Sequence, residues 1–393
     1  MAKIDDSVKK KVPELRFKGF TDDWEERKLG ELSNIVGGGT PSTSNSEYWD
    51  GDIDWYAPAE IGEQRYVSKS KKTITELGLK KSSARILPVG TVLFTSRAGI
   101  GNTAILGKEA TTNQGFQSIV PNPNKLDSYF IYSRTNELKR YGEVTGAGST
   151  FVEVSGKQMS KMSIMIPELS EQKKIGSFFE QLDNTIALHQ RKLDLLKEQK
   201  KGYLQKMFPK NGAKVPELRF EGFTDDWEER KLNENVENIG TGRSSFKAGL
   251  DYSEQTPYEV LGSTSVISYS DSFDHSGNFV LTARVGANAG NLYKHSGNVK
   301  ISDNTVYIQS KNLEFIFYLL TKYDLKKLAF GTGQPLIKAS ELKNLKLFSP
   351  KTFGEQQKIG SFFKQLDETI ALHQRKLDLL KEQKKGYLQK MFA

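Results

Sequence analysis

Two stretches of the chain place apolar residues alternately three and four positions apart. They cover residues 171–208 and 355–392, and only three of their 38 aligned positions differ: Lys173/Gln357, Glu180/Lys364 and Asn184/Glu368. A spacing of about 3.5 residues is typical of the contact seam of a coiled coil. The seam positions are Ile175, Phe179, Leu182, Ile186, His189, Leu193 and Leu196 in the first copy and Ile359, Phe363, Leu366, Ile370, His373, Leu377 and Leu380 in the second.

Each stretch is therefore predicted to form one long helix, about 57 Å in length. No proline interrupts the first copy, Gly202 is its predicted weak point, and Pro209 follows it as a stop. An amphipathic helix of this length needs a partner, and the other copy is the obvious one. Antiparallel pairing would bring His189 and His373 together at the centre. Alternatively, each histidine is only a tolerated polar residue that sets the register of the seam.

A second repeat comes before each variable part of the chain. Residues 11–29 read KVPELRFKGFTDDWEERKL, and residues 214–232 differ from them only at Lys18/Glu221. Phe17, Phe20 and Trp24 are predicted to anchor this leader by packing. The expected segments are a leader (1–29), a first variable domain (30–170), a helix (171–208), a linker with the second leader (209–232), a second variable domain (233–354) and a last helix (355–393).

Both variable parts contain short β-type runs separated by glycine and asparagine turns. Strands are predicted at 91–95, 104–106, 118–120, 280–282, 305–308 and 345–348, and helices at 126–141 and 313–327. The expected fold class is α+β. Two mixed α/β domains with twisted, mostly antiparallel sheets are separated by two long helices, which pair as an antiparallel coiled coil with pseudo-twofold symmetry.

The two variable parts are distant relatives of each other. TSRAGIGN at 95–102 and TARVGANA at 282–289 share Thr-x-Arg-x-Gly, and TNQGF at 112–116 corresponds to SDNTV at 302–306. The offset between the copies falls from 203 at the leaders to 187 at the arginine motif and 184 at the helices. Two nearly identical frames therefore hold two domains of common plan and different detail.

Composition limits the classes of function. The net charge of +9 favours a polyanionic partner, and the absence of cysteine excludes disulfides and thiolate zinc sites. No apolar leader or run of 18 apolar residues is present, so a protein of a reducing cytoplasm is expected.

These repeats resemble the specificity subunit of type I restriction-modification systems over nearly the whole chain. The helices are the most specific part of the resemblance, and the leaders are similar too. GGTPSTSNSEYWDGDIDWY at 38–56 and ITELGLKKSSARILPVGTVLFTSRAGIG at 74–101 look like the family's target recognition domains. The second domain departs from the first of these patterns and keeps only GTGRS at 240–244.

The resemblance implies a DNA-binding subunit without catalytic activity. Each variable domain would read one half of a split, asymmetric target in double-stranded DNA. The helices would set the spacing and dock two modification subunits, which carry S-adenosylmethionine and methylate adenine. Two restriction subunits that use ATP and magnesium would join the assembly. No cofactor or metal is expected in this chain.

Arg97 and Arg284 are the leading candidates for contact with DNA, since each follows a predicted strand in a glycine-containing turn. Such an arginine can bind guanine or phosphate, although a surface salt bridge is an equal alternative. Asparagine and glutamine pair well with adenine but also form turns. The secondary candidates are Ser96, Asn102, Asn113, Gln114, Asn288, Asn304 and Gln334. The loops 146–148 and 331–333 are candidates for backbone contacts to phosphate.

Two other functions compete with DNA recognition. A stand-alone nuclease or methylating enzyme is disfavoured, because neither a GxxxxGK[ST] motif nor an Asn/Asp-Pro-Pro-Tyr/Phe motif is present. Glu171 and Lys173 form a nuclease-like Glu-x-Lys, but the second copy has Gln357 in place of the lysine. Glu171 is interpreted instead as a charge at a helix start. A coiled-coil adaptor that binds only proteins does not explain two divergent domains in nearly identical frames.

Overall fold

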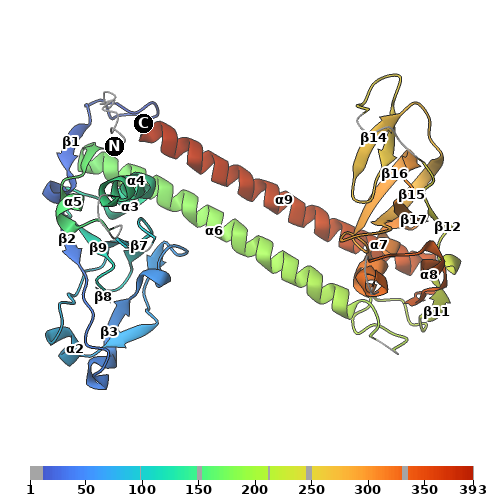
Figure 1. The fold of residues 1–393 in the computed structure, drawn as a ribbon, viewed down its shortest axis with the longest axis horizontal. Helices are drawn as coiled ribbons and strands as arrows, with labels where there is room; N and C mark the ends of the chain where they lie inside the picture. The colour runs from blue at the N-terminus through green and yellow to red at the C-terminus, as the bar shows by residue number, and fades with distance from the viewer. Residues whose placement is uncertain are drawn as a thin grey trace. The chain divides into compact units, whose positions relative to one another are not determined.

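Spatial contacts divide the chain into two compact units, and each is described by itself. Unit 1 combines residues 1–188 with 377–393, and unit 2 consists of residues 189–376. Each unit contains a sheet-rich part and sections of two long helices, α6 (Leu169–Lys206) and α9 (Phe353–Met391) (Figure 1). The computed structural model describes residues 12–97, 99–147, 153–210, 213–244, 250–329 and 335–392.

In unit 1 the first part of α6 runs antiparallel to the last part of α9. The rings of Phe178 and Tyr387 lie 5.1 Å apart between centroids. One turn further along α6, Asp183 Oδ1 pairs with Lys384 Nζ at 2.7 Å. Residue numbers therefore rise along α6 while they fall along α9, as the seam pattern predicts.

Unit 2 repeats this arrangement with the roles of the helices exchanged. The rings of Tyr203 and Phe362 lie 5.1 Å apart, and Lys200 Nζ pairs with Asp367 Oδ1 at 2.6 Å. These are the copies of the contacts in unit 1, because a shift of 184 residues converts one set into the other. The identical helical sequences thus form the same antiparallel contacts twice.

The two seam histidines meet, as antiparallel pairing predicts. The imidazole centroids of His189 and His373 are 5.7 Å apart, and Nδ1 of His373 is buried without a hydrogen-bond partner among the described residues. Burial lowers the pKa of His189, and the nearby Lys376 and His373 lower it further. His189 is therefore mainly neutral at neutral pH, and the pair is a polar interruption of an apolar seam.

Unit 2 is expected to lose stability through His189 when the pH falls. The pKa of His189 is lower in the folded chain than in the unfolded chain, so unfolding takes up a proton below about pH 6.5. This contribution is absent at higher pH and grows as the pH drops. Urea unfolding near pH 7.5 and about pH 5.5 should show a larger loss of stability for the wild-type chain than for His189→Gln. Equal losses in both proteins would contradict this interpretation of the histidine pair.

The outer ends of the seam belong to the cores of the units. Ile175 and Phe179 are buried with the helices of unit 1, and Ile359 and Phe363 are buried in the same way in unit 2. Nearer the middle, some seam residues are buried and others are half-buried. The buried ones are Leu193, Leu196 and Leu377, and the half-buried ones are Leu182, Ile186, Leu366, Ile370 and Leu380.

A second glycine in each long helix permits a close approach that sequence reasoning missed. Gly202 was the predicted weak point of the first helix, and no atom lies within 4 Å of the position that a Cβ would take there. Gly176 is different, because its Cβ would lie 2.4 Å from Asp127 Oδ1 and 3.1 Å from Phe130 N. Asp127 caps helix α3 (Ser128–Ser133), which precedes α6 in the chain, by accepting a hydrogen bond from Phe130 N at 2.8 Å. The glycine therefore lets α6 pack directly on that helix end.

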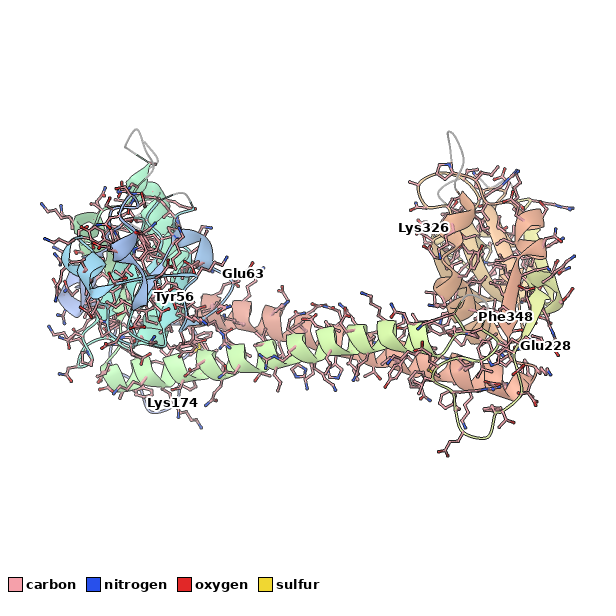
Figure 2. All side chains as sticks on the ribbon, turned by 90° about the horizontal axis from the view of Figure 1, so that it is seen from below. Tyr56, Glu63, Lys174, Glu228, Lys326 and Phe348 are labelled. Atoms are coloured by element: carbon pink, nitrogen blue, oxygen red, sulfur yellow. The ribbon has the colours of Figure 1, made fainter. Side chains whose placement is uncertain are left out.

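In its described part, unit 1 contains ten strands and five α-helices besides its sections of α6 and α9. Its elements before α6 are β1 (Glu25–Lys28), α1 (Leu29–Leu32), β2 (Ser33–Gly37), β3 (Trp49–Tyr56), β4 (Tyr66–Val67), β5 (Lys72–Ile74), α2 (Glu76–Lys80), β6 (Val92–Phe94), β7 (Thr103–Leu106), β8 (Thr111–Thr112), β9 (Gln117–Pro121), α3 (Ser128–Ser133), α4 (Thr135–Gly146), α5 (Gly156–Ser160) and β10 (Ser163–Ile166). Tyr56 lies among these strands, whereas Lys174 is exposed on α6 (Figure 2).

Unit 2 is built from longer strands. Its elements between the long helices are β11 (Glu228–Lys231), β12 (Asn238–Thr241), β13 (Tyr258–Leu261), β14 (Val266–Ser270), β15 (His275–Ala283), β16 (Leu292–Ile301), β17 (Thr305–Gln309), α7 (Leu313–Tyr323), α8 (Ala339–Asn344) and β18 (Lys346–Ser349). Each predicted strand coincides with an observed one, and both units are mixed α and β with mainly antiparallel pairing. The predicted fold class is confirmed.

The two units share one sheet topology. The strand order is β2-β9-β6-β7-β4 in unit 1, and the first five strands of unit 2 follow the order β12-β17-β15-β16-β13. The last pair in each series is parallel and the others are antiparallel. Unit 1 adds a separate sheet β5-β3-β8, whereas unit 2 adds the single strand β14. Two strands of the extra sheet, β3 and β5, precede the arginine motif, where the first variable part is longer, and β8 follows it.

Both predicted helices inside the variable parts differ from the expected bounds. The first is divided into α3 and α4 at Arg134, whose side chain donates to the backbone oxygen of Met165. The second ends at Tyr323 because Asp324 adopts a left-handed conformation with φ of 62°. A short 3-10 helix, Leu325–Ala329, follows it. Periodicity alone shows neither interruption, because the apolar spacing continues across both.

The leaders are integral parts of the units. Trp24 is buried in the core of unit 1 with Phe17 packed at its edge, while Phe20 is half-buried. Strand β1 pairs antiparallel with β10, as β11 does with β18. Arg16 donates from Nε and Nη2 to the two carboxylate oxygens of Glu171, both at 2.7 Å. Glu171 is fully buried, so it is a buried ion-pair partner as well as a charge at the helix start.

Candidate nucleic-acid interface

The arginine motif of unit 1 forms a closed loop between β6 and β7. Thr95 Oγ1 donates to the backbone oxygen of Gly99 at 2.7 Å and accepts from Asn102 N at 2.9 Å. Gly99 and Gly101 have φ angles of 106° and 96°, which favour glycine. The threonine and the two glycines therefore explain why this sequence forms a tight loop around Arg97.

Arg97 lies in this loop with a partly exposed side chain. Its Nε is 2.8 Å from Glu153 Oε1, and its side chain remains 46% exposed. The segment around Glu153 is held against the loop, because Val154 N donates to the backbone oxygen of Ser96 at 3.2 Å. The carboxylate steadies one edge of the guanidinium, while no other ion pair involves Arg97 within the described residues. An arginine held in this way is suited to bind a base edge or a phosphate.

The second predicted loop of unit 1 lies beside the first. Ser96 N donates to the backbone oxygen of Gly115 at 2.8 Å, which brings Asn113 and Gln114 next to the arginine loop. Asn113 Oδ1 accepts from Gly115 N at 2.8 Å and so forms a turn, whereas exposed Gln114 accepts from the hydroxyl of Thr40. Asn102 is exposed at the end of the first loop. These side chains share one edge of the unit.

The side chain of Ser96 does not share that exposure. It is fully buried, and its hydroxyl has no hydrogen-bond partner among the described residues. Ser96 thus holds the loop through its backbone, and its side chain presents no surface to a ligand.

Unit 2 builds its arginine loop in a related way. Gly290 N donates to Thr282 Oγ1 at 3.0 Å, and Gly286 and Gly290 have φ angles of 86° and 89°. Arg284 N donates to the backbone oxygen of Asn304 at 2.8 Å. The side chain of Arg284 is exposed and makes no ion pair with any residue that the structure describes. The same motif therefore presents a steadied arginine in unit 1 and, as far as the described residues extend, an arginine without an ion pair in unit 2.

The remaining candidates of unit 2 fall partly on this loop. Asn304 is exposed beside Arg284, and Asn288 accepts from Asn291 Nδ2 at 3.1 Å across a turn. Gln334 and the loop 331–333 lie outside the described residues. Of the corresponding loop in unit 1, Gly146 is the last residue of α4, and residue 148 lies outside the described part.

Comparison with known proteins assigns the chain to a family. Residues 21–198 and 224–382 match the family described as the type I restriction modification DNA specificity domain. The chain belongs to this family. The resemblance stated from the leaders and helices is therefore confirmed, and the two matches cover both units of this specificity protein.

Individual relatives within the specificity family match one part or most of the chain. The MjaIX specificity subunit of a type I restriction enzyme from Methanocaldococcus jannaschii is 37% identical over 179 residues, which are 45% of this chain and 41% of that relative. The matched stretch thus spans about two fifths of that relative. The MjaVIII specificity subunit of the same organism is 22% identical over 400 residues, covering 93% of this chain and 91% of the relative.

A solved structure supports the fold of the specificity protein. The S subunit of a type I restriction-modification system from M. genitalium aligns with a TM-score of 0.66 at 14% identity, covering 97% of this chain and 99% of that one. In the described part of the chain, no helix is long and apolar enough to cross a membrane. The described residues also contain no cluster of three or more histidines and acidic residues that could hold a metal ion.

Sequence reasoning missed the residues that support the candidate loops. Glu153 lies 56 positions after Arg97, outside any motif, and Thr40 is as remote from Gln114. In the sequence, only the polar character of the surrounding segments points to Glu153 and Thr40 as supporting residues. Thr95 and the glycines, in contrast, are visible in the repeated motif itself.

Proposed function

We propose that this chain is the DNA specificity subunit of a type I restriction-modification complex and has no catalytic activity of its own. Each unit reads one half of a bipartite, asymmetric target in double-stranded DNA. The names of the relatives support this proposal, since they are specificity subunits of type I restriction enzymes. The positive net charge of +9 suits a polyanionic partner.

One observation carries the proposal. The two units share five strands in the same order, and each places an arginine loop after the equivalent strand, β6 or β15. The side chains around the two arginines differ: Glu153 steadies Arg97, whereas Arg284 has no such partner among the described residues. A shared scaffold with different contact groups is what reading two unlike half-sites requires.

The long helices serve two further roles in this proposal. Their constant sequence sets the separation of the half-sites, as fixed protein geometry does for other DNA-binding proteins. They also dock two modification subunits, which bind S-adenosylmethionine and methylate adenine. Two restriction subunits that use ATP and magnesium complete the assembly. These cofactors belong to the partner subunits.

Methylation mapping tests the proposed function. The chain is co-purified with its modification subunit, and the complex is incubated with S-adenosylmethionine and random-sequence DNA. The expected result is a split motif with one methylated adenine in each half and a constant spacer. A complex that methylates adenine without sequence preference would overturn the proposal.

Arg97→Ala is expected to impair reading of one half-site, and Arg284→Ala to impair reading of the other. An arginine bound to a base edge contributes about 1–3 kcal/mol of discrimination, so binding to the intact target should weaken about 5- to 150-fold. Competition binding with DNA altered in one half or the other measures the effect. Arg85→Ala, which removes another exposed arginine from unit 1, is the control for net charge. Equal effects of Arg85→Ala and Arg97→Ala would refute the assignment.

Exposed leucines on the helices are expected to contact the modification subunits. Leu188 and Leu195 on α6 and their copies Leu372 and Leu379 on α9 are between 51% and 66% exposed and lie seven residues apart on each helix. Exposed apolar groups of this kind mark interaction surfaces. Leu195→Asp with Leu372→Asp should weaken capture of the modification subunit at least about tenfold. Val89→Asp, a change at an equally exposed site in unit 1, should leave capture unchanged.

A further inference from the structure

The three differences between the helical repeats lie on one strip of the helix. Positions 173, 180 and 184 are separated by seven and four residues, so their side chains leave the helix in nearly the same direction. The same holds for 357, 364 and 368. The remaining positions, 35 of 38, are identical. The two helices therefore diverge along a single face.

In unit 1 this strip contacts the sheet-rich part. Glu180 Oε1 accepts from the hydroxyl of Tyr66 at 2.7 Å, and Asn184 Oδ1 accepts from Arg65 Nη2 at 2.9 Å. Tyr66 begins β4, the edge strand of the five-stranded sheet. Burial and the bond to Glu180 raise the pKa of Tyr66, so the hydroxyl stays a donor. Arg65 Nη1 also donates to Tyr129 at 3.2 Å, which joins this contact to α3.

In unit 2 two of the three equivalent positions line a hollow. Gln357 and Lys364 line a cavity of about 670 Å³ together with Lys311 and Lys358. Neither Lys364 nor Glu368 forms a hydrogen bond or ion pair with any described residue of the sheet-rich part. Lysine at 364 is thus compatible with unit 2, whereas a lysine at position 180 would place its charge beside Arg65.

The neighbouring contact that both units share is identical. Tyr129 donates to Asp183 Oδ2 at 2.8 Å in unit 1, and Tyr318 donates to Asp367 Oδ2 at 2.7 Å in unit 2. Asp183 and Asp367 are copies of each other, and each also pairs with a lysine of the other long helix. The helix is therefore constant where the two domains bind it alike and different where they bind it differently.

We infer that positions 173, 180 and 184, with their copies 357, 364 and 368, match each helix to its own recognition domain. Glu180 and Asn184 are positioning residues that fix β4 of the first domain on α6 through Tyr66 and Arg65. The helix of unit 2 has Lys364 where α6 has the acceptor Glu180, and the charged Glu368 where α6 has Asn184, so it cannot hold the first domain in the same way. The consequence for target reading rests on the proposed function, whereas the contact itself does not.

The test exchanges the strips in the full-length chain. One variant carries Lys173→Gln, Glu180→Lys and Asn184→Glu, which makes the two helical repeats identical. The reverse variant carries Gln357→Lys, Lys364→Glu and Glu368→Asn and is the matched control. Amide hydrogen exchange is followed at β4 and β7. The first variant should exchange about tenfold faster there, while exchange in the sheet of unit 2 should stay within about twofold in the reverse variant.

A double-mutant cycle distinguishes matching from a general weakening of the helix. Tyr66→Phe and Glu180→Ala remove the two sides of one hydrogen bond, so their effects on exchange at β4 should be non-additive. Strict additivity, or unchanged exchange in the first variant, would overturn the inference. Binding of the first variant to DNA is a separate readout: loss of one half-site supports the link to target reading. Faster exchange with full DNA recognition would leave the matching intact but contradict that link.

Discussion

Glu355→Ala is expected to destabilise unit 2 by about 3–5 kcal/mol, because it removes one partner of a buried ion pair. Glu355 is 2% exposed and accepts from Arg219 Nε at 2.7 Å and Nη2 at 2.8 Å. It also accepts from Trp227 Nε1 at 3.2 Å. The variant would leave a nearly buried guanidinium and an indole N–H without these bonds. Urea unfolding followed by tryptophan fluorescence measures the loss.

The control for this prediction is an exposed ion pair in the same unit. Glu228, labelled in Figure 2, pairs with Arg230, and both side chains are about 40% exposed. Glu228→Ala should cost far less than Glu355→Ala, because solvent screens such pairs. If the two variants lost the same stability, the buried pair would not hold the second leader to α9 as the geometry indicates. Glu171→Ala repeats the test in unit 1, where Arg16 is the partner.

Gly360→Ala is expected to destabilise unit 2 by about 1–3 kcal/mol, although alanine is the better helix former. A Cβ at Gly360 would lie 2.7 Å from Phe315 N and 2.9 Å from Glu314 Cβ. Both atoms belong to the first turn of α7, and the nearer one is backbone, so relief requires α7 to move away from α9. Thermal or urea unfolding of the full-length chain measures the change.

Gly386→Ala is the matched control within the same helix. No atom lies within 4 Å of the Cβ position at Gly386. The same substitution there should therefore stabilise the chain by about 0.5–1 kcal/mol through helix propensity. The opposite signs separate the effect of close packing from that of the residue type. A stabilising effect of Gly360→Ala would show that α9 and α7 are not in close contact.

The long helices were predictable because their information is local and repeated. A seam spacing sustained over 38 residues and a matching second copy indicate both the helices and their antiparallel pairing. Six of the strands inside the variable parts were also predicted. The order of the strands in the sheet was not predicted, because β6 pairs with β7 and β9 through contacts that no spacing pattern encodes. The interruption at Arg134 likewise coincides with a tertiary contact, the bond from its side chain to the backbone oxygen of Met165.

The candidate site shows the same division. Arg97 and Arg284 could be selected because the motif occurs twice and contains glycines that permit a tight loop. Glu153 could not, since an acidic residue distant in sequence carries no signal of its own. The burial of Ser96 was equally hidden, because serine is common both in loops and beneath them. In the sequence, Gly176 is only a residue of low helix propensity, and its role follows from the close approach of α3 in the structure.

The interleaved composition of unit 1 has a consequence for biosynthesis. Its core includes Met391, with Tyr387 and Phe392 packed at the edge, and these residues emerge from the ribosome after everything in unit 2. Unit 2 is a continuous segment and can fold while the last helix is still being made. Unit 1 cannot complete its fold until the last helix has been made, because its core joins residues more than 200 positions apart in the chain. Such distant closure is slow, so nascent unit 1 exposes its apolar core for longer than unit 2 does.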